Sequence, residues 1–526
     1  MKGLIKSRKA KYGGAAILLS ALVLAVVIIL NIIVAVLASR YEWMYSDMNK
    51  VTVYDISEAC EEYLSDHVFS RVDTVNAKYA SEGREKQKIR VIFCDDEKNI
   101  ESVQAQKYIL DAVYDVRELF PEYIDVDFIN IWENPSIARE YGVTATSDVV
   151  CEFDGRHETM NLTDFYVYSI NDGTNAIGYN GEKIFASCLM RVTQENTPIC
   201  YFTANHGETF GDYEFMRTVV EAGYAAEFID LSNEDIPDDC DLLITFAPMQ
   251  DLLISDGASG ISEVDKLNRY MEQGGKYMVF LSADTFASGE RANLEGFLAE
   301  WGIKYMHKKG AGENGVEECY LIKDASNSLT VDGYTVLAKR VDIGGGAELS
   351  QSFHKKNAFR NATCIGYADE FLIAPGESDG DRKATVGGKE RSVFPLFESY
   401  ATAEAWAGGR AVARASDEPF ALMTMSTQLC DNGETAYLIA SASTEFASEE
   451  FMQSVALGNN GTLMGIIRYM GKDNAPVELS YKPFANTEIT ALTVKDANII
   501  TVSFAVIPAL VCLIAGTIVL IRRKNA

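Results

Sequence analysis

The 526-residue sequence predicts an α/β fold in which two α/β units lie between two membrane-spanning helices. The units are predicted because strand-like and helix-like stretches alternate from about Val51 to Val192 and again from about Thr197. The spans are predicted because residues 13–38 and 499–521 are long, mostly aliphatic and uncharged. Each segment exceeds the roughly 20 residues that a helix needs to cross a bilayer.

The first unit, residues 39–192, begins with a membrane-proximal segment and continues as alternating strands and helices. Hydrophobic periodicity separates the two kinds of element. The predicted strands are KIRVIFCDD (88–96), YIDVDFINIW (123–132) and SDVVCEF (147–153). The predicted helices are 103–119 and a short one in NPSIAREYGV (134–143). This order indicates a compact α/β unit.

The second unit, residues 193–471, opens with the same alternation. Its first strands are expected at Pro198–Ala204, Tyr224–Leu231, Cys240–Pro248 and Lys276–Asp284. Helical stretches are expected at 212–222, 261–273 and 292–301. Repetition of strand, helix and strand predicts a parallel sheet whose right-handed crossovers cover both faces.

The rest of the second unit follows a different pattern. Residues from about 302 to 431 are rich in Gly, Ser and Thr and contain short strand-like pieces, which we interpret as a β-rich insertion. A core strand is expected at Ala436–Ser443, and a helix from about Glu449 to Met470. Residues 472–498 then form a juxtamembrane segment.

Basic residues flank the two apolar segments and predict their orientation, because cytoplasmic ends of spans are enriched in Lys and Arg. We therefore expect a two-pass protein of the plasma membrane, in contact with lipid, with both termini cytoplasmic and the large domain outside. A cleaved signal peptide is the alternative for the first segment, although its apolar stretch is far longer than usual. The flanking residues are Lys2, Lys6, Arg8, Lys9 and Lys11 before the first span, and Arg522, Arg523 and Lys524 after the second.

The formal net charge of −29 restricts the partners of the protein. Because both tails are basic, the domain between them is even more acidic than the whole chain. Such an acidic domain repels phosphate backbones, so nucleic-acid binding is excluded. Nine of the ten cysteines lie singly between the two spans, without the spacing of a zinc site. Their pairing as disulfides stays open.

The common nucleotide and hydrolase motifs are absent from the sequence. There is no G-x-x-x-x-G-K-[ST] loop, G-x-G-x-x-G fingerprint, G-x-S-x-G elbow or H-E-x-x-H helix. We therefore expect no cofactor and no metal. If the protein serves an ATP-driven process, another chain binds the nucleotide.

One loop carries chemistry-bearing residues, the stretch YFTANHGETF at 201–210. Asn205, His206, Gly207 and Glu208 follow a predicted strand, at the edge where parallel sheets place ligands. A catalytic interpretation makes His206 a general base for Ser282 or a partner of Glu208, but the sequence around Ser282 lacks the glycines of a strained elbow. The alternatives are a turn, in which Gly207 supplies a positive φ, or a binding loop. We interpret it as a candidate binding loop with no catalytic residue.

Several motifs occur in an order that resembles one family, the gliding-motility-type ABC-transport auxiliary components (GldG-like). They include DFINIWENPSIAREYGV at 127–143, YFTANHGE at 201–208 and the pair DLLITFAPMQDL and YMEQGGKYMVFLSAD. LEGFLAEWGIKY and the terminal ITALT, IPALV and IRR are further matches. The family usually has a glycine where Asn205 precedes His206, whereas His206, Gly207 and Glu208 match.

The resemblance implies a thioredoxin-like unit followed by a unit similar to class I glutamine amidotransferases without their cysteine nucleophile. It also implies partnership with an ABC permease and a cytoplasmic ATPase. We therefore expect a non-catalytic, membrane-anchored auxiliary subunit of an ABC transporter, whose acidic domain contacts substrate, envelope or a partner. Two alternatives stay open, a membrane-tethered hydrolase or amidotransferase-like enzyme using His206 with Ser282 or Glu208, and an envelope scaffold.

Overall fold

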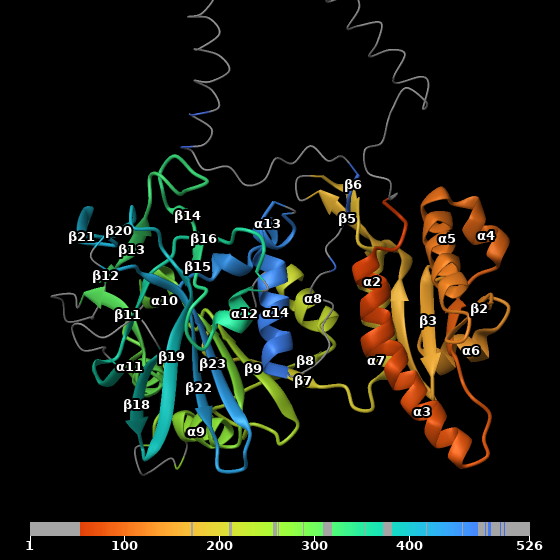
Figure 1. Ribbon diagram of the computed structural model, residues 1–526, viewed down its shortest axis with the longest axis horizontal. Helices are drawn as coiled ribbons and strands as arrows, with labels where there is room; N and C mark the ends of the chain where they lie inside the picture. The colour runs from red at the N-terminus through yellow and green to blue at the C-terminus, as the bar shows by residue number, and fades with distance from the viewer. Residues whose placement is uncertain are drawn as a thin grey trace, which may run out of the picture. The chain divides into compact units, whose positions relative to one another are not determined.

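The computed structural model describes most of the chain after its first 52 residues. The described residues are 53–169, 172–209, 213–255, 260, 262–287, 289–308, 318–351, 353–371, 381–416, 418–454, 456–471, 479, 482–484, 495 and 499. They form a mixed α/β fold with two main hydrophobic clusters. We call the parts built around these clusters the small lobe (53–193 with 482–484) and the large lobe (199–471) (Figure 1).

The small lobe contains a four-stranded sheet in the order β2-β1-β3-β4. Strand β1 pairs parallel with β2 and antiparallel with β3, and β3 and β4 form a hairpin. The elements are α2 (Glu58–Tyr63), the π-helix η3 (Leu64–Phe69), α3 (Ser70–Ser81), β1 (Ile89–Phe93), α4 (Glu97–Ser102), α5 (Gln104–Leu119), β2 (Ile124–Phe128), α6 (Pro135–Tyr141), β3 (Asp148–Phe153), β4 (Arg156–Asn161), the 3-10 helix η4 (Leu162–Phe165), β5 (Tyr166–Ser169), β6 (Asp172–Tyr179), α7 (Gly181–Thr193) and β24 (Lys482–Pro483).

The large lobe is built on one sheet that changes from parallel to antiparallel. Strands β8, β7, β9, β10 and β23 are neighbours in that order and all pair parallel. Strand β23 then pairs antiparallel with β22, and β22 also pairs antiparallel with β17 and β19. The parallel half and its helices comprise β7 (Ile199–Thr203), α8 (Tyr213–Glu221), β8 (Ala225–Ile229), β9 (Cys240–Phe246), α9 (Glu263–Glu272), β10 (Lys276–Phe280), α10 (Ala283–Ala287), α11 (Ala292–Glu300), β23 (Thr435–Ser441), η6 (Glu445–Ala447), α13 (Glu449–Met452) and α14 (Asn459–Gly471).

The remaining elements of the large lobe are mostly short strands between α11 and β23. They are β11 (Ile303–Lys308), β12 (Glu318–Cys319), β13 (Leu321–Lys323), β14 (Thr335–Leu337), β15 (Lys339–Arg340), α12 (Ala347–Gln351), β16 (Ala358–Arg360), β17 (Cys364–Tyr367), η5 (Asp369–Phe371), β18 (Arg382–Val386), β19 (Lys389–Glu398), β20 (Glu404–Ala407), β21 (Arg410–Arg414) and β22 (Ala421–Leu429).

The structure confirms the predicted strands and helices of the parallel half. Strands β7, β8, β9 and β10 each lie within the range expected for them, and α8, α9 and α11 follow the expected helical periodicity. Aromatic packing fixes α8 on the sheet, because the Phe215 ring lies 5.1 Å from that of Phe246 and 5.3 Å from that of Phe280. The β8–β9 connection, residues 230–239, is described throughout and contains no helix, and none is expected there from the sequence.

The expected helix from Glu449 to Met470 is two helices, α13 and α14. Gly458 lies between the two helices, and its N–H donates to the carbonyl oxygen of Lys356 at 2.8 Å. A Cβ on Gly458 would lie 3.1 Å from the carbonyl oxygen of Lys355. A contact with a distant segment therefore ends the helical periodicity.

The described residues also correct the expected membrane topology. None of their helices is both long and apolar enough to cross a bilayer. The longest, α5, has 16 residues and carries Asp111, Asp115 and Arg117. This finding contradicts the prediction of a two-pass membrane protein of the plasma membrane. The segments on which it rested, 13–38 and, apart from Ile499, 499–521, lie outside the described residues, as do the basic residues that flank them.

Candidate functional site

The predicted loop lies at the carboxyl edge of the parallel strands, directly after β7. Two of its residues have left-handed backbones, Asn205 at φ 77° and Gly207 at φ 73°. A Cβ on Gly207 would lie 3.0 Å from the Cβ of Met249. Glycine is needed here both for its backbone conformation and for this close approach, as the turn interpretation expects.

His206 is buried between two carboxylates. Its Nε2 lies 3.0 Å from Oε2 of Glu263, the first residue of α9, and its Nδ1 lies 3.5 Å from Oε1 of Glu208. The second distance is at the outer limit of a hydrogen bond, so the Glu208 contact is mainly ionic. The Glu263 side chain is fully buried and that of Glu208 is 2% exposed. The three side chains form a buried ion triad.

The triad determines the protonation of the histidine. Glu208 first, and then Glu263, raise the pKa of His206 to about 10, although burial alone would lower it. Burial alone would raise the pKa of Glu208, but contacts with the His206 side chain and with backbone N–H groups lower it below its usual value. At neutral pH the imidazole is therefore a cation without a free lone pair, which a general base requires.

The triad also joins two loops of the carboxyl edge. The carbonyl oxygen of His206 accepts hydrogen bonds from the N–H groups of Met249 and Gln250, both at 2.8 Å. Glu263 Oε2 accepts one from the N–H of Leu253 at 2.6 Å, and the Glu263 N–H donates to the Leu253 carbonyl at 3.0 Å. The loop after β9 is thereby fastened to the loop after β7 and to the start of α9.

Asn205 of the candidate loop also joins two segments of this edge. Its Nδ2 donates to the Asp230 carboxylate at the end of β8. Asp230 also accepts hydrogen bonds from Ser232 and Asn233. Burial alone would raise the pKa of Asp230, but these three partners lower it to about 2. Each polar side chain of the loop therefore has a partner within the protein.

Ser282, the nucleophile of the catalytic interpretation, follows β10 and is buried. Its N–H donates to Thr285 Oγ1 at 3.1 Å, and the two hydroxyl oxygens are 3.5 Å apart. The described partners of the His206 side chain are Glu208 and Glu263, and Ser282 is not one of them. The structure does not bring His206 and Ser282 together as a nucleophile and its base.

Two residues at this edge escaped the sequence analysis, Glu263 and Arg291. The buried Arg291 guanidinium donates to the carbonyl oxygens of Pro248 and Met249 in the loop after β9, and to that of Thr285 at 2.8 Å. Neither residue belongs to a recognisable motif, and both act on segments remote in sequence. Their roles become visible only when the strands are assembled.

Three exposed side chains at this edge are apolar. Met249, Leu253 and Ile254 are 40%, 48% and 57% exposed, on the loop that His206 and Arg291 hold in place. We call these three side chains the apolar rim. A fixed backbone that presents exposed apolar side chains is suited to binding, because little conformational entropy is lost on association.

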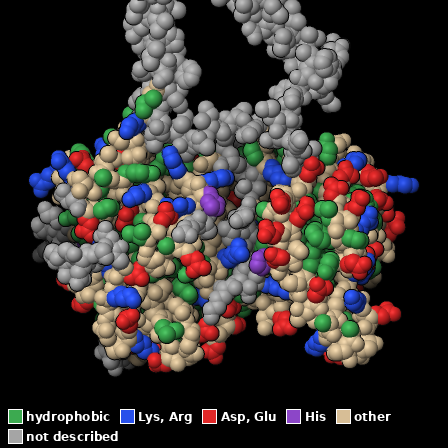
Figure 2. Space-filling model, viewed as in Figure 1, with side chains coloured by type: hydrophobic (Ala, Val, Ile, Leu, Met, Phe, Trp, Pro, Cys, Tyr) green, Lys and Arg blue, Asp and Glu red, His purple; other side chains and the backbone are tan. Residues whose placement is uncertain are grey.

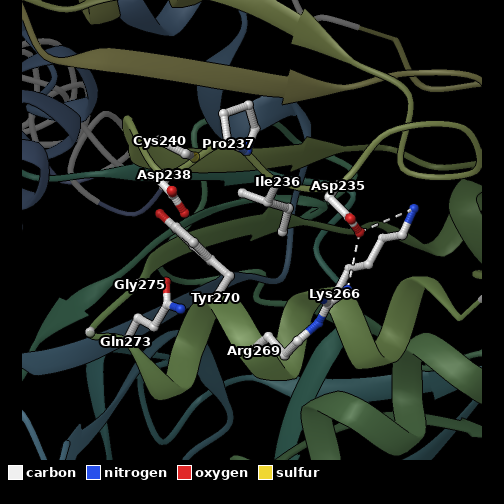
Figure 3. Close-up of a pocket in the computed structure, with 11 residues that line it drawn as sticks. Asp235, Ile236, Pro237, Asp238, Cys240, Lys266, Arg269, Tyr270, Gln273 and Gly275 are labelled. Atoms are coloured by element: carbon white, nitrogen blue, oxygen red, sulfur yellow. Dashed lines mark hydrogen bonds and ion pairs between the residues drawn. The ribbon is translucent and has the colours of Figure 1, made fainter.

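A pocket of about 300 Å³ lies at the opposite, amino edge of the same strands (Figure 3). Asp235 lies 3.0 Å from an Arg269 nitrogen and 3.7 Å from Lys266 Nζ, and dashed lines in Figure 3 mark these contacts. Lys266 also donates to the carbonyl oxygens of Leu231 and Glu234. The pocket shares no residue with the candidate loop. It is lined by Asp235, Ile236, Pro237, Asp238, Cys240, Lys266, Arg269, Tyr270, Gln273, Gly274 and Gly275.

The described part of the chain holds potential metal ligands and nine thiols. It contains no group of three or more His, Cys, Asp or Glu side chains arranged to hold a metal ion. The nine cysteines there are free thiols, and burial raises the pKa of Cys60, Cys94, Cys240 and Cys364 to about 12. Such thiols are poor nucleophiles at neutral pH.

Comparison with known proteins does not assign the chain to a family. No family model matches the chain, and no curated protein matches it. Three solved structures are similar to 52% of the chain: the mmIFT52 N-terminal domain (13% identity, TM-score 0.34), PurLQS from Thermotoga maritima (12%, 0.25) and the cytoplasmic protein STM3548 from Salmonella typhimurium (8%, 0.29). These matches cover 98%, 100% and 98% of the respective chains. Scores this low carry no argument about function.

Proposed function

We propose that the protein is a non-catalytic binding subunit that works with the separate ATPase and permease of an ABC transporter. The order of its motifs and the absence of a nucleotide-binding loop from its sequence support this role. The acidic large lobe would engage a partner or substrate through the apolar rim, Met249, Leu253 and Ile254.

The observation that carries the non-catalytic part of the proposal is the buried His206 triad. A histidine held as a cation between two carboxylates cannot take up a proton at neutral pH. It stabilises the edge on which the rim is mounted. The enzyme alternative needs a neutral imidazole beside a nucleophile. The position of His206 between two carboxylates supports the binding role instead.

The finer fold assignments belong to the same proposal. In the small lobe, a parallel β1-α5-β2 unit is followed by the β3-β4 hairpin and α7, which supports a thioredoxin-like unit. In the large lobe, five parallel strands with helices between most of them support an amidotransferase-like sheet. Ala247, which follows β9 with φ 51°, carries no nucleophilic group at that strand end.

Copurification tests the proposed partnership. The tagged full chain would be isolated from its own host cells in the mild detergent that a permease requires, and checked for a copurifying ATPase and permease. We expect both partners in fixed stoichiometry. Their absence under these conditions would overturn the proposal and leave the envelope scaffold.

A rim variant locates the contact. Leu253→Asp with Ile254→Asp should reduce recovery of the partners at least tenfold, because charges in a desolvated interface are costly. The matched control is Val331→Asp with Leu429→Asp, whose side chains are 90% and 69% exposed elsewhere on the large lobe. Equal losses in both variants would mean that the rim is not the contact.

The enzyme alternative has a separate test. Purified wild-type protein and its Ser282→Ala and His206→Gln variants would be assayed for release of ammonia from glutamine and for hydrolysis of activated esters. We expect no turnover that depends on either residue. Turnover that Ser282→Ala abolishes without loss of folding would refute the non-catalytic role.

A further inference from the structure

The loop between β2 and α6 in the small lobe carries an unusually exposed aromatic side chain. Trp132 is 75% exposed, whereas its neighbour Ile131 is 5% exposed and packs with Ile92, Cys94, Val143 and Val150. Ile131 thus anchors the loop in the core, while Trp132 lies at the surface. No hydrogen bond of the indole N–H is present among the described residues, so the group is available to a ligand.

The loop is held by Asn130, not left to adapt on binding. Asn130 Oδ1 accepts hydrogen bonds from the N–H groups of Trp132 at 3.0 Å and Glu133 at 3.4 Å. Its Nδ2 donates to Asp96 Oδ2 at 3.0 Å and to Asp95 Oδ1 at 3.4 Å, both just after β1. The indole is therefore mounted on a turn fixed to the edge of the sheet, which lowers the entropic cost of binding.

The charge around this turn is negative. Asp95 and Asp96 contact Asn130 directly, Glu97 begins α4, and Glu133 follows Trp132. Acidic side chains also dominate the face of the small lobe seen in Figure 2, on the right. Neighbouring basic residues are Lys98 and Arg139, and the latter donates to the carbonyl of Pro135. We call Trp132, Asp95, Asp96 and Glu133 the Trp132 patch.

A turn that carries both an exposed indole and several carboxylates selects a cation. A guanidinium or ammonium group is attracted to the face of an indole, Trp being the best of the aromatic side chains, and carboxylates add charge-assisted hydrogen bonds. Trp is also one of the residues enriched at binding hot spots. Anionic lipid surfaces and nucleic acid are disfavoured, because the same carboxylates repel phosphate.

We propose that the Trp132 patch binds a basic segment of a partner protein, with an Arg or Lys side chain of that segment stacked on the indole of Trp132. The carboxylates of Asp96 and Glu133 pair with flanking basic residues of the same segment. Asp95 helps to position the turn by accepting a hydrogen bond from Asn130. This inference does not depend on the proposed transport role or on the apolar rim of the large lobe.

A peptide titration tests the proposal. The probe is a fluorescently labelled 12-residue peptide of alternating Arg and Ser, titrated with the full chain at 0.15 M NaCl and followed by anisotropy. The matched peptide has citrulline, which is uncharged and nearly isosteric, in place of each Arg. We expect Trp132→Ala to weaken binding of the Arg peptide about tenfold, Trp132→Phe by less, and Glu133→Gln about threefold.

Control variants separate the patch from the general acidity of the protein. Glu227→Gln removes an equal charge from an exposed position on β8, and Val331→Ala shortens an exposed apolar side chain. Both should bind the Arg peptide as the wild type does. Thermal unfolding should be unchanged in the Trp132 variants, since the indole is exposed and its loss removes little packing.

Three results would overturn the proposal. The first is equal affinity of the wild type and Trp132→Ala for the Arg peptide. The second is equal binding of the Arg and citrulline peptides. The third is Trp132-dependent binding to phosphatidylcholine vesicles without binding of the peptide, which would make a lipid surface the occupant.

Discussion

At the scale of the residue, His206 shows how one side chain changes its meaning between sequence and structure. It precedes Glu208 by two residues in the chain, which suggests that the two form an acid–base pair. In the fold it lies within 3.0 Å of a second carboxylate, Glu263, and is held as a cation. The candidate loop was found from the sequence because strand, histidine and glycine are local signals. The deciding partner was not, since nothing local links Glu263 to the loop.

His206→Gln should destabilise the protein by about 3 kcal/mol at pH 6, because it leaves two buried carboxylates without their cation. The folded-state pKa is raised, so the stabilisation is fully present below the unfolded value of about 6.5 and is lost as pH rises toward 10. Urea unfolding of both proteins between pH 6 and 10 measures this dependence.

The control for that experiment is His354→Gln, at an exposed position of the large lobe. It should change the free energy of unfolding by less than about 0.5 kcal/mol. If the difference between wild type and His206→Gln stays constant from pH 6 to pH 10, the histidine is not protonated in the folded state, and the enzyme alternative regains its base.

At the scale of the element, the short strand β24 returns the chain to the small lobe after the large lobe is complete. Lys482 pairs with Tyr179 of β6, and the Phe484 N–H donates to the Ile177 carbonyl at 3.0 Å. Lys482 Nζ lies 2.9 Å from Glu182 Oε1, and Glu182 also accepts hydrogen bonds from Ser57. The two ends of the small lobe are thus joined by one buried carboxylate.

Lys482→Met should loosen this junction and destabilise the small lobe by about 2 kcal/mol, because Glu182 keeps its burial but loses its cation. Amide hydrogen exchange at Phe484 and at the paired residues of β6 should become at least tenfold faster. Lys304→Met, which removes an exposed lysine from β11, is the control and should leave exchange in β6 unchanged. Unchanged exchange in Lys482→Met would show that strand pairing alone holds β24.

Strands and helices with a clear period were predictable, and elements defined by tertiary contacts were not. The runs of β7, β9 and β10 are apolar enough to be recognised, and α9 follows its Ser262 cap. The break between α13 and α14 depends on Lys355 and Lys356 beside Gly458, and the return of β24 depends on β6. Neither leaves a periodic signal in the segment itself.

At the scale of the whole molecule, the excess of negative charge is the dominant property. A formal charge of −29 on 526 residues opposes the compact state through self-repulsion. Paired acids such as Asp235 and Glu221 offset part of this repulsion locally. A net negative charge remains after such local pairing, and its repulsion acts over distances that salt can screen.

We therefore expect the melting temperature at pH 7.5 to rise by several degrees between 0.02 and 0.3 M NaCl, as screening shortens the reach of the repulsion. At pH 4.6, the isoelectric point expected from the composition, the same salt step should have little effect. Differential scanning calorimetry at both pH values measures the two steps. A fall in melting temperature with salt at pH 7.5 would mean that attractive ion pairs outweigh the net repulsion.

The sequence by itself determined the α/β class, the order of most strands and helices, the acidic charge and the turn at Asn205 to Glu208. These depend on local periodicity, turn chemistry and composition, which the chain carries wherever it folds. Only the tertiary structure decided that His206 is paired with Glu263, that Ser282 is not among its described partners, and that Trp132 lies exposed on a turn held by Asn130. Those facts depend on distances between segments remote in sequence, and local patterns do not encode such distances.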